Sequence, residues 1–522
     1  MVSTERKGPV EEGTEQPSSP PSPTHSPPSV TVAVKQSPRV LCYCVALASG
    51  ILLFGYDLVI VGNVSSLPEF QRDFGRRLHG KLIIPSLWLS LWDVASPVGG
   101  ILGSLSAGLI QDRVGRRVCL GVASVVSAGA VAIAYVSNRP GDIDARRAVF
   151  FMGKLVQGFA VHVVTCTTQT YMSEVLPAVL RGPVLAFFPL FTLLGQLVGS
   201  VVVYEALDVR GSRGYLDCFA SQWAFSVVPL VVAVGLPESP TYLVRRGRVG
   251  EARRAQRRLE GTDGVADKKV GELRLFLETE DREARSDAAG YRECFRGVDR
   301  RRTGVVMFAN LVPSLFGLPL LSKCSYFLQM VGMRPHRSFV FLQVGIAMGL
   351  VANIVSMWTL TAFGRVPLIL GSLGVSTLAW VGMGVAGCFQ GNASMWYTGI
   401  TMIAIIVVCG IGAWPASYAV GAEASSLRLR AKTQGLGWFV TGLSSAVFNL
   451  ILPYIFNPDE GDLRAKTGFV FAGFCIIALV ATWFIVPEMK DRTPAEIDDM
   501  FEAAIPTRRF RNWSPRNERP VV

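Results

Sequence analysis

Residues 40–62 have the sequence VLCYCVALASGILLFGYDLVIVG, an apolar stretch of 23 residues with one charged side chain, Asp57. A helix of about 20 residues is needed to cross the ~30 Å hydrocarbon core of a bilayer. Backbone groups in that core cannot bond to water, so the expected structure is a helix that satisfies its own amides and carbonyls. The stretch therefore predicts a transmembrane helix.

Stretches of similar length and composition recur along the chain. Of its 522 residues, 50% are hydrophobic and only 17% are charged, whereas soluble globular chains carry about 25% charged residues. Apolar length predicts twelve spans, at 40–62, 84–110, 117–136, 147–170, 183–203, 222–236, 304–329, 338–363, 366–388, 395–420, 433–456 and 467–486. We therefore predict an all-α membrane protein with twelve transmembrane helices.

The spans form two groups of six around a long polar segment that is dense in arginine. Lys and Arg are enriched in cytoplasmic loops, so this segment should lie in the cytoplasm, and an even number of spans places both chain ends there as well. The predicted parts are a disordered tail at 1–39, a six-helix bundle at 40–242, a cytoplasmic loop with helices at 243–303, a second six-helix bundle at 304–486 and a cytoplasmic tail at 487–522.

Charge and cysteine placement argue against several other classes of protein. The formal net charge of +12 comes from Lys and Arg in short loops between spans, so we expect no nucleic-acid partner. The ten cysteines fall mostly in apolar spans, and none forms a Cys-x-x-Cys motif with partner histidines, so no metal site is expected. No set of nucleophile, base and orienting group is recognisable. We therefore predict neither an enzyme nor a cofactor.

Short motifs of the first half recur in the second half at a nearly constant separation. The pairs are Gly115 with Gly364, Arg116 with Arg365, Glu174 with Glu423 and Arg181 with Arg430, each 249 residues apart, and Pro237-Glu238 with Pro487-Glu488, 250 residues apart. Such a parallel repeat is typical of transporters whose two halves rock about a shared central site. The repeat therefore predicts two pseudo-symmetric bundles and transport by alternating access.

These motifs resemble those of the sugar porter family of the major facilitator superfamily, over nearly the whole chain beyond the first tail. The motifs that carry the resemblance are Phe54-Gly-Tyr-Asp57, Asp112-Arg-Val-Gly-Arg-Arg117, Tyr171-Met-Ser-Glu174, Pro237-Glu-Ser-Pro240 and Ser325-Tyr-Phe327. The stretch from Glu423 to Phe501 is similar to fungal maltose and α-glucoside permeases. The resemblance implies a plasma-membrane transporter of a sugar, α-glucoside or polyol that works as a monomer.

The resemblance also implies an ionic latch at the cytoplasmic face of each half. Its predicted residues are Asp112, Arg113, Arg116, Glu174 and Arg181 in the first half and Arg365, Glu423 and Arg430 in the second. The alternative is that these loops only anchor helix ends. Thr361, Ala362 and Val366 stand where the family usually has charged residues, so the second latch should be the weaker one.

Asp57 is a carboxylate inside an apolar span, and such groups are costly and therefore usually functional. Counted at 1.5 Å per residue, Asp57 lies about 8 Å and Lys154 about 10 Å from the external ends of their spans. In proton-coupled members of the family, the aspartate loads and releases the proton and a span-4 arginine modulates it; this chain has Lys154 in place of that arginine. The resemblance therefore implies that Asp57 and Lys154 couple transport to protons, and the alternative is a static structural pair.

Three further polar residues lie in or near apolar spans. Asp93 is near the external end of the second span, where it either has a function or simply reaches headgroup water. Lys323 is expected to extend its ammonium group to the external interface. His162 is either a proton relay or a packed neutral ring.

The resemblance is thinnest at the substrate site, which sugar porters line with Gln, Asn and Trp. Pro189 replaces one glutamine of a family pair, and the predicted substrate-binding residues are Gln196, Ser314, Trp414, Tyr418 and Thr441. A lining with few amides discriminates poorly for hydroxyl-rich ligands. A less hydroxylated natural product therefore stays open as substrate, and a membrane sugar sensor that moves no solute stays open as another class.

Two other features carry predictions of their own. Kinks at Pro189, Pro313 and Pro319 are tolerable in lipid only if neighbours or cavity water bond to the freed carbonyls, which places these segments beside the cavity. The alternative is that they are kinks with no role in ligand binding. Asn63 and Asn392 begin Asn-x-Ser sequons at predicted external turns and are candidate glycosylation acceptors.

Overall fold

The computed structural model describes residues 35, 38–78, 81–176, 188–261, 263–286, 291–389, 391–425, 429–490, 492 and 494–513. Within these residues it has twelve helices that are long and apolar enough to cross a membrane. The prediction of twelve transmembrane helices is therefore confirmed, and the chain is a multi-pass membrane protein.

The first six spans are single helices. They are α2 (Pro38–Val64), α4 (Ser86–Val114), α5 (Arg116–Tyr135), α6 (Ile143–Val175), α8 (Phe188–Glu205) and α9 (Arg213–Gly235). The sixth helix begins at Arg213, before the predicted residue 222. Its first two turns contain the charged residue Asp217, so they were not counted as part of the apolar stretch. Apolar length alone therefore located this span but not its beginning.

Two of the six spans of the second half are broken into shorter helices. The seventh span comprises α13 (Gly297–Leu315), α14 (Leu318–Leu321) and α15 (Cys324–Val331), and the tenth comprises α18 (Asn392–Ile411) and α19 (Ala413–Ala424). The unbroken spans are α16 (Pro335–Ala362), α17 (Arg365–Ala386), α20 (Arg430–Phe456) and α21 (Thr467–Ile485).

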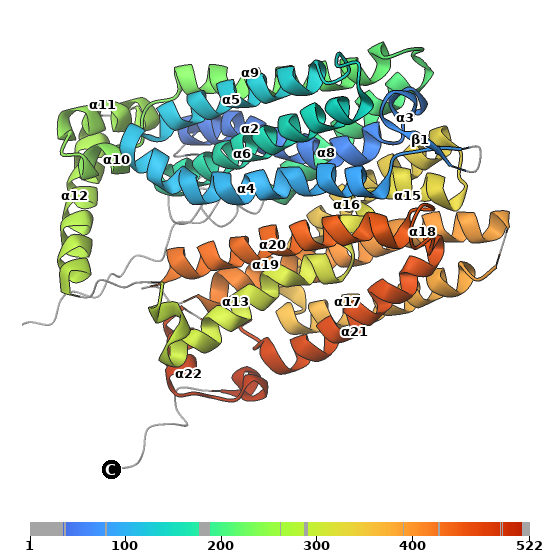
Figure 1. Ribbon diagram of the computed structural model, residues 1–522. Coiled ribbons are helices and arrows are strands. Elements are labelled where there is room, and N and C mark those ends of the chain that lie inside the picture. The colour runs from blue at the N-terminus through green and yellow to red at the C-terminus, as the bar shows by residue number, and fades with distance from the viewer. Residues whose placement is uncertain are drawn as a thin grey trace, which may run out of the picture.

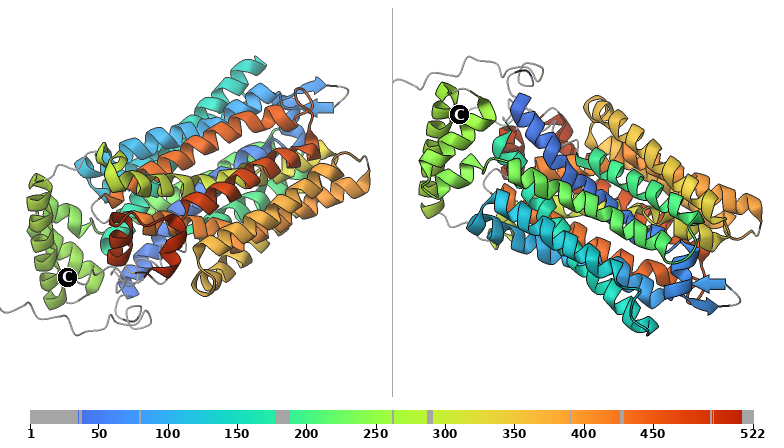
Figure 2. Two further views of the ribbon diagram at one scale, coloured as in Figure 1. Left: turned by 90° about the horizontal axis from the view of Figure 1, so that it is seen from below. Right: turned by 90° about the horizontal axis from the view of Figure 1, so that it is seen from above.

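The spans form two bundles that lie side by side, with the first half in blue to green and the second in yellow to red (Figure 1; Figure 2). One end carries α3 (Pro68–Phe74) and a hairpin of β1 (Arg76–Leu78) and β2 (Lys81–Ile83). The opposite end carries α10 (Pro240–Arg245), α11 (Val249–Glu260), α12 (Asp263–Ser286) and α22 (Pro494–Glu502). The arginine-rich segment lies at this second end, so the enrichment of Lys and Arg in cytoplasmic loops predicts that this end faces the cytoplasm, and we call the two ends cytoplasmic and external on that basis.

Short 3-10 helices complete the described elements. They are η1 (Ala206–Asp208), η2 (Glu293–Phe295), η3 (Arg464–Lys466) and η4 (Thr507–Asn512). The last of these, with α22, holds the C-terminal segment against the start of α13, where Arg302 forms an ion pair with Asp498 and lies over the ring of Phe501.

Glycine allows the helices of the first bundle to pack backbone against backbone. A side chain on Gly99 of α4 would lie 2.1 Å from the carbonyl oxygen of Leu155 in α6, and one on Gly158 would lie 2.2 Å from that of Ser96. Small residues are the usual means by which membrane helices approach closely, because lipid offers no hydrophobic drive for association. These contacts fix α4 against α6, which carry Ser96 and Lys154.

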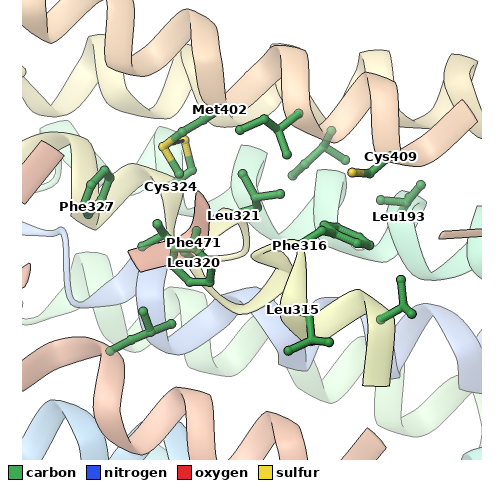
Figure 3. Packing of buried hydrophobic residues seen from close by; sticks show 14 of the residues in the cluster. Leu193, Leu315, Phe316, Leu320, Leu321, Cys324, Phe327, Met402, Cys409 and Phe471 are labelled. Carbon is green, nitrogen blue, oxygen red and sulfur yellow. Dashed lines mark hydrogen bonds between the residues drawn. The ribbon is translucent and has the colours of Figure 1, made fainter. Parts of the chain in front are cut away.

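The break in the seventh span is stabilised by a neighbouring indole. Gly317 has φ +105°, and a side chain there would lie 2.7 Å from the ring of Trp380 in α17. The Trp380 Nε1–H donates a 3.0 Å hydrogen bond to the carbonyl of Phe316, which the break leaves without a helical partner. The segment is packed between Leu315, Leu320, Leu321 and Phe471 (Figure 3). Non-helical backbone at membrane depth is tolerated where protein satisfies it in this way.

The structure changes the interpretation of one of the three prolines. Pro319 lies in the first turn of α14, where a missing amide costs little, rather than at a kink within a helix. Pro313 lies inside α13 and precedes the break at Phe316 by three residues. Pro189 is the second described residue of α8, and because residues 177–187 lie outside the described part of the chain, the kink predicted there stays a prediction.

Candidate functional site

A buried ion pair joins α2 and α6 in the first bundle. Lys154 Nζ contacts Asp57 Oδ1, and both side chains are buried. The other carboxylate oxygen of Asp57 accepts a 2.6 Å hydrogen bond from the Ser96 hydroxyl of α4. The structure thus brings together the two residues that were expected at similar depth, and Ser96 adds a third helix to the site.

His162 lies two turns from Lys154 on α6, on the cytoplasmic side of the ion pair. Its Nδ1 is 2.9 Å from the carbonyl of Gly158, and its ring packs edge-on against Phe54 with centroids 5.4 Å apart. A side chain at Gly100 would collide with this ring at 2.4 Å. The tight packing favours the interpretation of His162 as a packed ring.

The cytoplasmic cluster of the first half is built around Arg116 and Glu174. Arg116 Nη2 lies 2.9 Å from Glu174 Oε1, and Nη1 lies 3.3 Å from the exposed Asp112. Glu238 accepts a 2.9 Å hydrogen bond from the backbone amide of Arg116 at the start of α5. The carboxylate of Glu238 therefore acts at a helix N-terminus, where negative charge is favourable.

Two further residues were predicted for the latch of the first half, Arg113 and Arg181. The side chain of Arg113 is exposed, and only its carbonyl joins the cluster, by accepting a 3.2 Å hydrogen bond from the Tyr242 hydroxyl. Arg181 lies outside the described residues.

The second half repeats the cluster with fewer members. Arg365 Nη2 lies 2.7 Å from Glu423 Oε1, and Glu488 accepts a 3.1 Å hydrogen bond from the backbone amide of Arg365. The side chains of Arg365 and Glu423 are 18% and 28% exposed, against 5% and 13% for Arg116 and Glu174. Arg430 is the first residue of α20, and its side chain falls outside what the structure describes.

Each of these ion pairs lies within one half and does not bridge the two halves. Arg116 and Glu174 both belong to the first bundle, and Arg365 and Glu423 both belong to the second. The two described pairs fix the cytoplasmic ends of neighbouring helices within each bundle. Arg181 and the side chain of Arg430, the other predicted cations of the latch, lie outside the described part of the chain, so a latch between the halves stays a prediction.

A polar cluster joins α13 and α20 of the second half. Thr441 Oγ1 lies 3.3 Å from the side-chain oxygen of Asn310, and the hydroxyls of Ser314 and Ser444 are 2.9 Å apart. Two of the predicted substrate-binding residues, Ser314 and Thr441, belong to this cluster. Asn310, the only amide in it, was not among the predicted residues.

The other predicted substrate-binding residues lie on different helices. Trp414 and Tyr418 are one turn apart on α19, and Tyr418 stacks on Trp438 with ring centroids 5.9 Å apart. Gln196 is buried on α8 of the first half. The helices α19 and α20 belong to the second half and α8 belongs to the first half. The predicted substrate-binding residues therefore come from both halves.

The two candidate glycosylation acceptors are in contrasting surroundings. Asn392 is exposed at the start of α18. Asn63 is fully buried in α2 and accepts a 3.0 Å hydrogen bond from Ser325. A glycan has no room at Asn63 in this arrangement, so of the two predicted acceptors only Asn392 remains.

Some residues of the site had a signal in the sequence and others did not. Glu238 and Glu488 were visible as the repeated Pro-Glu pair, although the repeat does not reveal that they cap α5 and α17. Asn310 was an amide within an apolar span, which is a usable signal. Ser96 had none, because serines are frequent in these spans and only the packing of α4 on α2 selects it.

A doubled six-helix bundle with a buried charge pair and matching cytoplasmic clusters defines a membrane transporter of the major facilitator fold, and not an enzyme. The chain belongs to the sugar transporter family, because the family model described as "Sugar (and other) transporter" matches residues 41–501.

Individual relatives agree with this assignment, and a solved structure agrees with the fold. The "MFS transporter fmqE" of Aspergillus fumigatus is 31% identical over 466 residues, which cover 88% of this chain and 85% of the relative. The "Alpha-glucosides permease MPH3" of Saccharomyces cerevisiae is 27% identical, covering 92% of this chain and 81% of the permease. The partially occluded inward-open xylose transporter XylE from E. coli superposes with a TM-score of 0.69 at 18% identity, over 88% of this chain and all of XylE.

Proposed function

We propose that this protein carries a sugar, α-glucoside or polyol across the plasma membrane by alternating access, driven by protons. The observation that carries the proposal is the buried Asp57–Lys154 ion pair with its hydrogen bond from Ser96. Two charges removed from water are expensive to keep inside a membrane protein, and such groups usually mark ion or proton pathways. Asp57 would bind a proton in one half-cycle and return to Lys154 in the other.

The substrate class rests on relatives and on the polar cluster of the second half. The α-glucoside permease MPH3 and the maltose permease MAL61 of Saccharomyces cerevisiae are named for sugar substrates, and XylE is described as a proton:xylose symporter. In this chain Asn310, Ser314 and Thr441 would provide hydrogen bonds to sugar hydroxyls. A single chain contains both halves of the fold, so we propose that it works as a monomer.

A specific observation favours a second candidate, a less hydroxylated natural product. The cluster between α13 and α20 contains one amide, and its hydroxyls already bond to each other or to Asn310. The aromatic rings of Tyr418 and Trp438 stack between α19 and α20, and α20 also carries Thr441 of the cluster. A binding site lined by these residues would offer apolar surface with few polar groups for orientation, which suits a flat or partly apolar solute.

Counterflow in proteoliposomes distinguishes these candidates and tests transport itself. Vesicles loaded with unlabelled solute are diluted into labelled solute, across a panel of maltose, glucose, xylose, sorbitol and an aromatic metabolite. The proposal expects overshoot with maltose or another hydroxyl-rich member of the panel. Overshoot with the aromatic metabolite alone would favour the second candidate, and binding without any overshoot would contradict transport and favour a sensor.

A further inference from the structure

A second buried ion pair crosses from one half of the protein to the other near the external end. Lys323 Nζ lies 2.6 Å from Asp93 Oδ2, and the two side chains are only 7% and 4% exposed. Asp93 belongs to α4 of the first half, and Lys323 lies between α14 and α15 of the second half. The expectation that Lys323 reaches the external interface is therefore wrong, because its ammonium group turns inward to a carboxylate.

The path of the lysine side chain requires the two halves to be in close contact. A side chain at Gly62 of α2 would lie 3.4 Å from both Cα and Cγ of Lys323, so this glycine lets the broken seventh span pass directly against α2. The lysine stem then continues beyond α2 to reach Asp93 on α4. Three helices from the two halves must therefore be closed together for the pair to form.

The pair is the innermost of several polar contacts that join the halves at the external end. Next outward, the Ser325 hydroxyl donates a 3.0 Å hydrogen bond to the Asn63 side chain. Further outward, the Asn457 amide donates to the carbonyl of Ile84 at 3.1 Å and to the Ser86 hydroxyl at 3.0 Å. These contacts hold the external ends of the two halves together in the present arrangement.

We propose that Asp93 and Lys323 form the charged lock of the external gate, an ion pair that exists when the external side is shut and separates when it opens. This inference rests on the proposed transport by alternating access. An ion pair out of water repays its desolvation only with close geometry, and removing one partner leaves an uncompensated buried charge. When the gate opens, water can solvate both groups, so the pair contributes to switching between two states instead of holding one permanently.

The lock is also adjacent to the Asp57–Lys154 pair. Asp93 precedes Ser96 by three residues on α4, and Ser96 donates to Asp57. Lys154 is near enough to interact electrostatically with Asp93. The gate and the proposed coupling site therefore share α4 and a common set of charges.

The test measures access from outside and needs no transported solute. Ser325 is replaced by cysteine as a reporter between the halves, with the exposed Cys388 changed to serine, and right-side-out vesicles are treated with a membrane-impermeant maleimide. Lys323→Met and Asp93→Asn are expected to raise the labelling rate of the reporter at least tenfold. Lys323→Arg and the exchanged pair Asp93→Lys with Lys323→Asp are expected to return it towards the unmodified rate.

An outer ion pair supplies the matched control. Arg76 also bridges the halves, at 3.0 Å from Asp459, and its own side chain is 52% exposed whereas that of Asp459 is 3% exposed. Without Arg76, Asp459 still accepts hydrogen bonds from the backbone amide of Ser86 and the side chain of Asn457, so Arg76→Gln should leave the labelling rate nearly unchanged. The lock is refuted if Lys323→Met and Asp93→Asn label no faster than the unmodified protein, or no faster than Arg76→Gln. Counterflow on the same variants reports separately on transport, so failure of the lock and failure of the proposed function can be told apart.

Discussion

The hydroxyl of Ser96 donates a 2.6 Å hydrogen bond to the carboxylate oxygen of Asp57 that Lys154 does not contact. This bond links α4 to the ion pair between α2 and α6. A hydrogen bond to a charged group contributes about 1.5–3 kcal/mol. Ser96 therefore stabilises the state in which Asp57 has released its proton.

Ser96→Ala should slow proton-driven uptake while leaving solute exchange intact. The lower end of that energy range corresponds to a loss of about tenfold in rate. Exchange of solute across the membrane does not require Asp57 to release its proton, so counterflow should be nearly unchanged. Initial rates of uptake with and without an inward proton gradient give the comparison. Ser96→Thr keeps the hydroxyl and serves as the control, and equal loss in both assays would argue that Ser96 is only structural.

The two cytoplasmic clusters should differ in their contribution to stability. Arg116→Ala breaks the ion pair with the partly buried Glu174, which among the described residues then keeps only the hydrogen bond from Ser239. Loss of one partner costs about 3–5 kcal/mol for well-buried pairs. Arg365→Ala should cost less, because its pair with Glu423 is more exposed and water replaces part of the lost interaction. Thermal unfolding of both variants in detergent is the measurement, and each variant is the control for the other. An equal or larger decrease for Arg365→Ala would contradict the proposed difference.

Trp380→Phe should destabilise the fold by leaving the carbonyl of Phe316 unpaired at the break of the seventh span. An unsatisfied buried acceptor costs about 1–3 kcal/mol, and the smaller ring adds a packing loss. The same substitution at Trp358, whose side chain is 65% exposed on α16, is the matched control and should have little effect. Thermal unfolding in detergent compares the two variants. Equal decreases in their unfolding temperatures would contradict a specific contribution of the hydrogen bond from Trp380 to Phe316.

Asn310→Ala should weaken binding of a hydroxyl-rich substrate. Loss of one hydrogen bond of about 1.4 kcal/mol corresponds to a tenfold rise in KM, with kcat changed much less. Asn449→Ala is the control, because Asn449 bonds to Ser445 on its own helix, outside the cluster of Asn310 and Thr441. Concentration series of uptake measure both constants. A KM that rises equally in the two variants would place the substrate elsewhere.

The sequence predicted the spans well because the length of an apolar stretch is dictated by the bilayer itself. In the seventh span it indicated kinks at Pro313 and Pro319 but not the break between them at Phe316 and Gly317, and it carried no prediction of the break at Gly412 in the tenth span. At Gly412 a side chain would lie 2.0 Å from Ser372 Oγ, a constraint that arises only from packing of α17. The positions of such breaks depend on neighbours that a single sequence does not identify.

The two buried ion pairs also differ in how far the sequence could predict them. Asp57 and Lys154 could be paired from their equal depth in two spans, because depth follows directly from the rise of a helix. The partner of Asp93 could not be identified in this way. Lys323 reaches Asp93 only because the seventh span breaks beside Gly62 and brings two distant parts of the chain together.

The most direct test of proton-driven transport is solute-induced proton movement in proteoliposomes that contain a pH-sensitive dye. Addition of a solute that shows counterflow should acidify the lumen of vesicles with the unmodified protein. Asp57→Asn should abolish this acidification and still permit counterflow of the same solute. Undiminished acidification with Asp57→Asn, or none with the unmodified protein, would contradict the account.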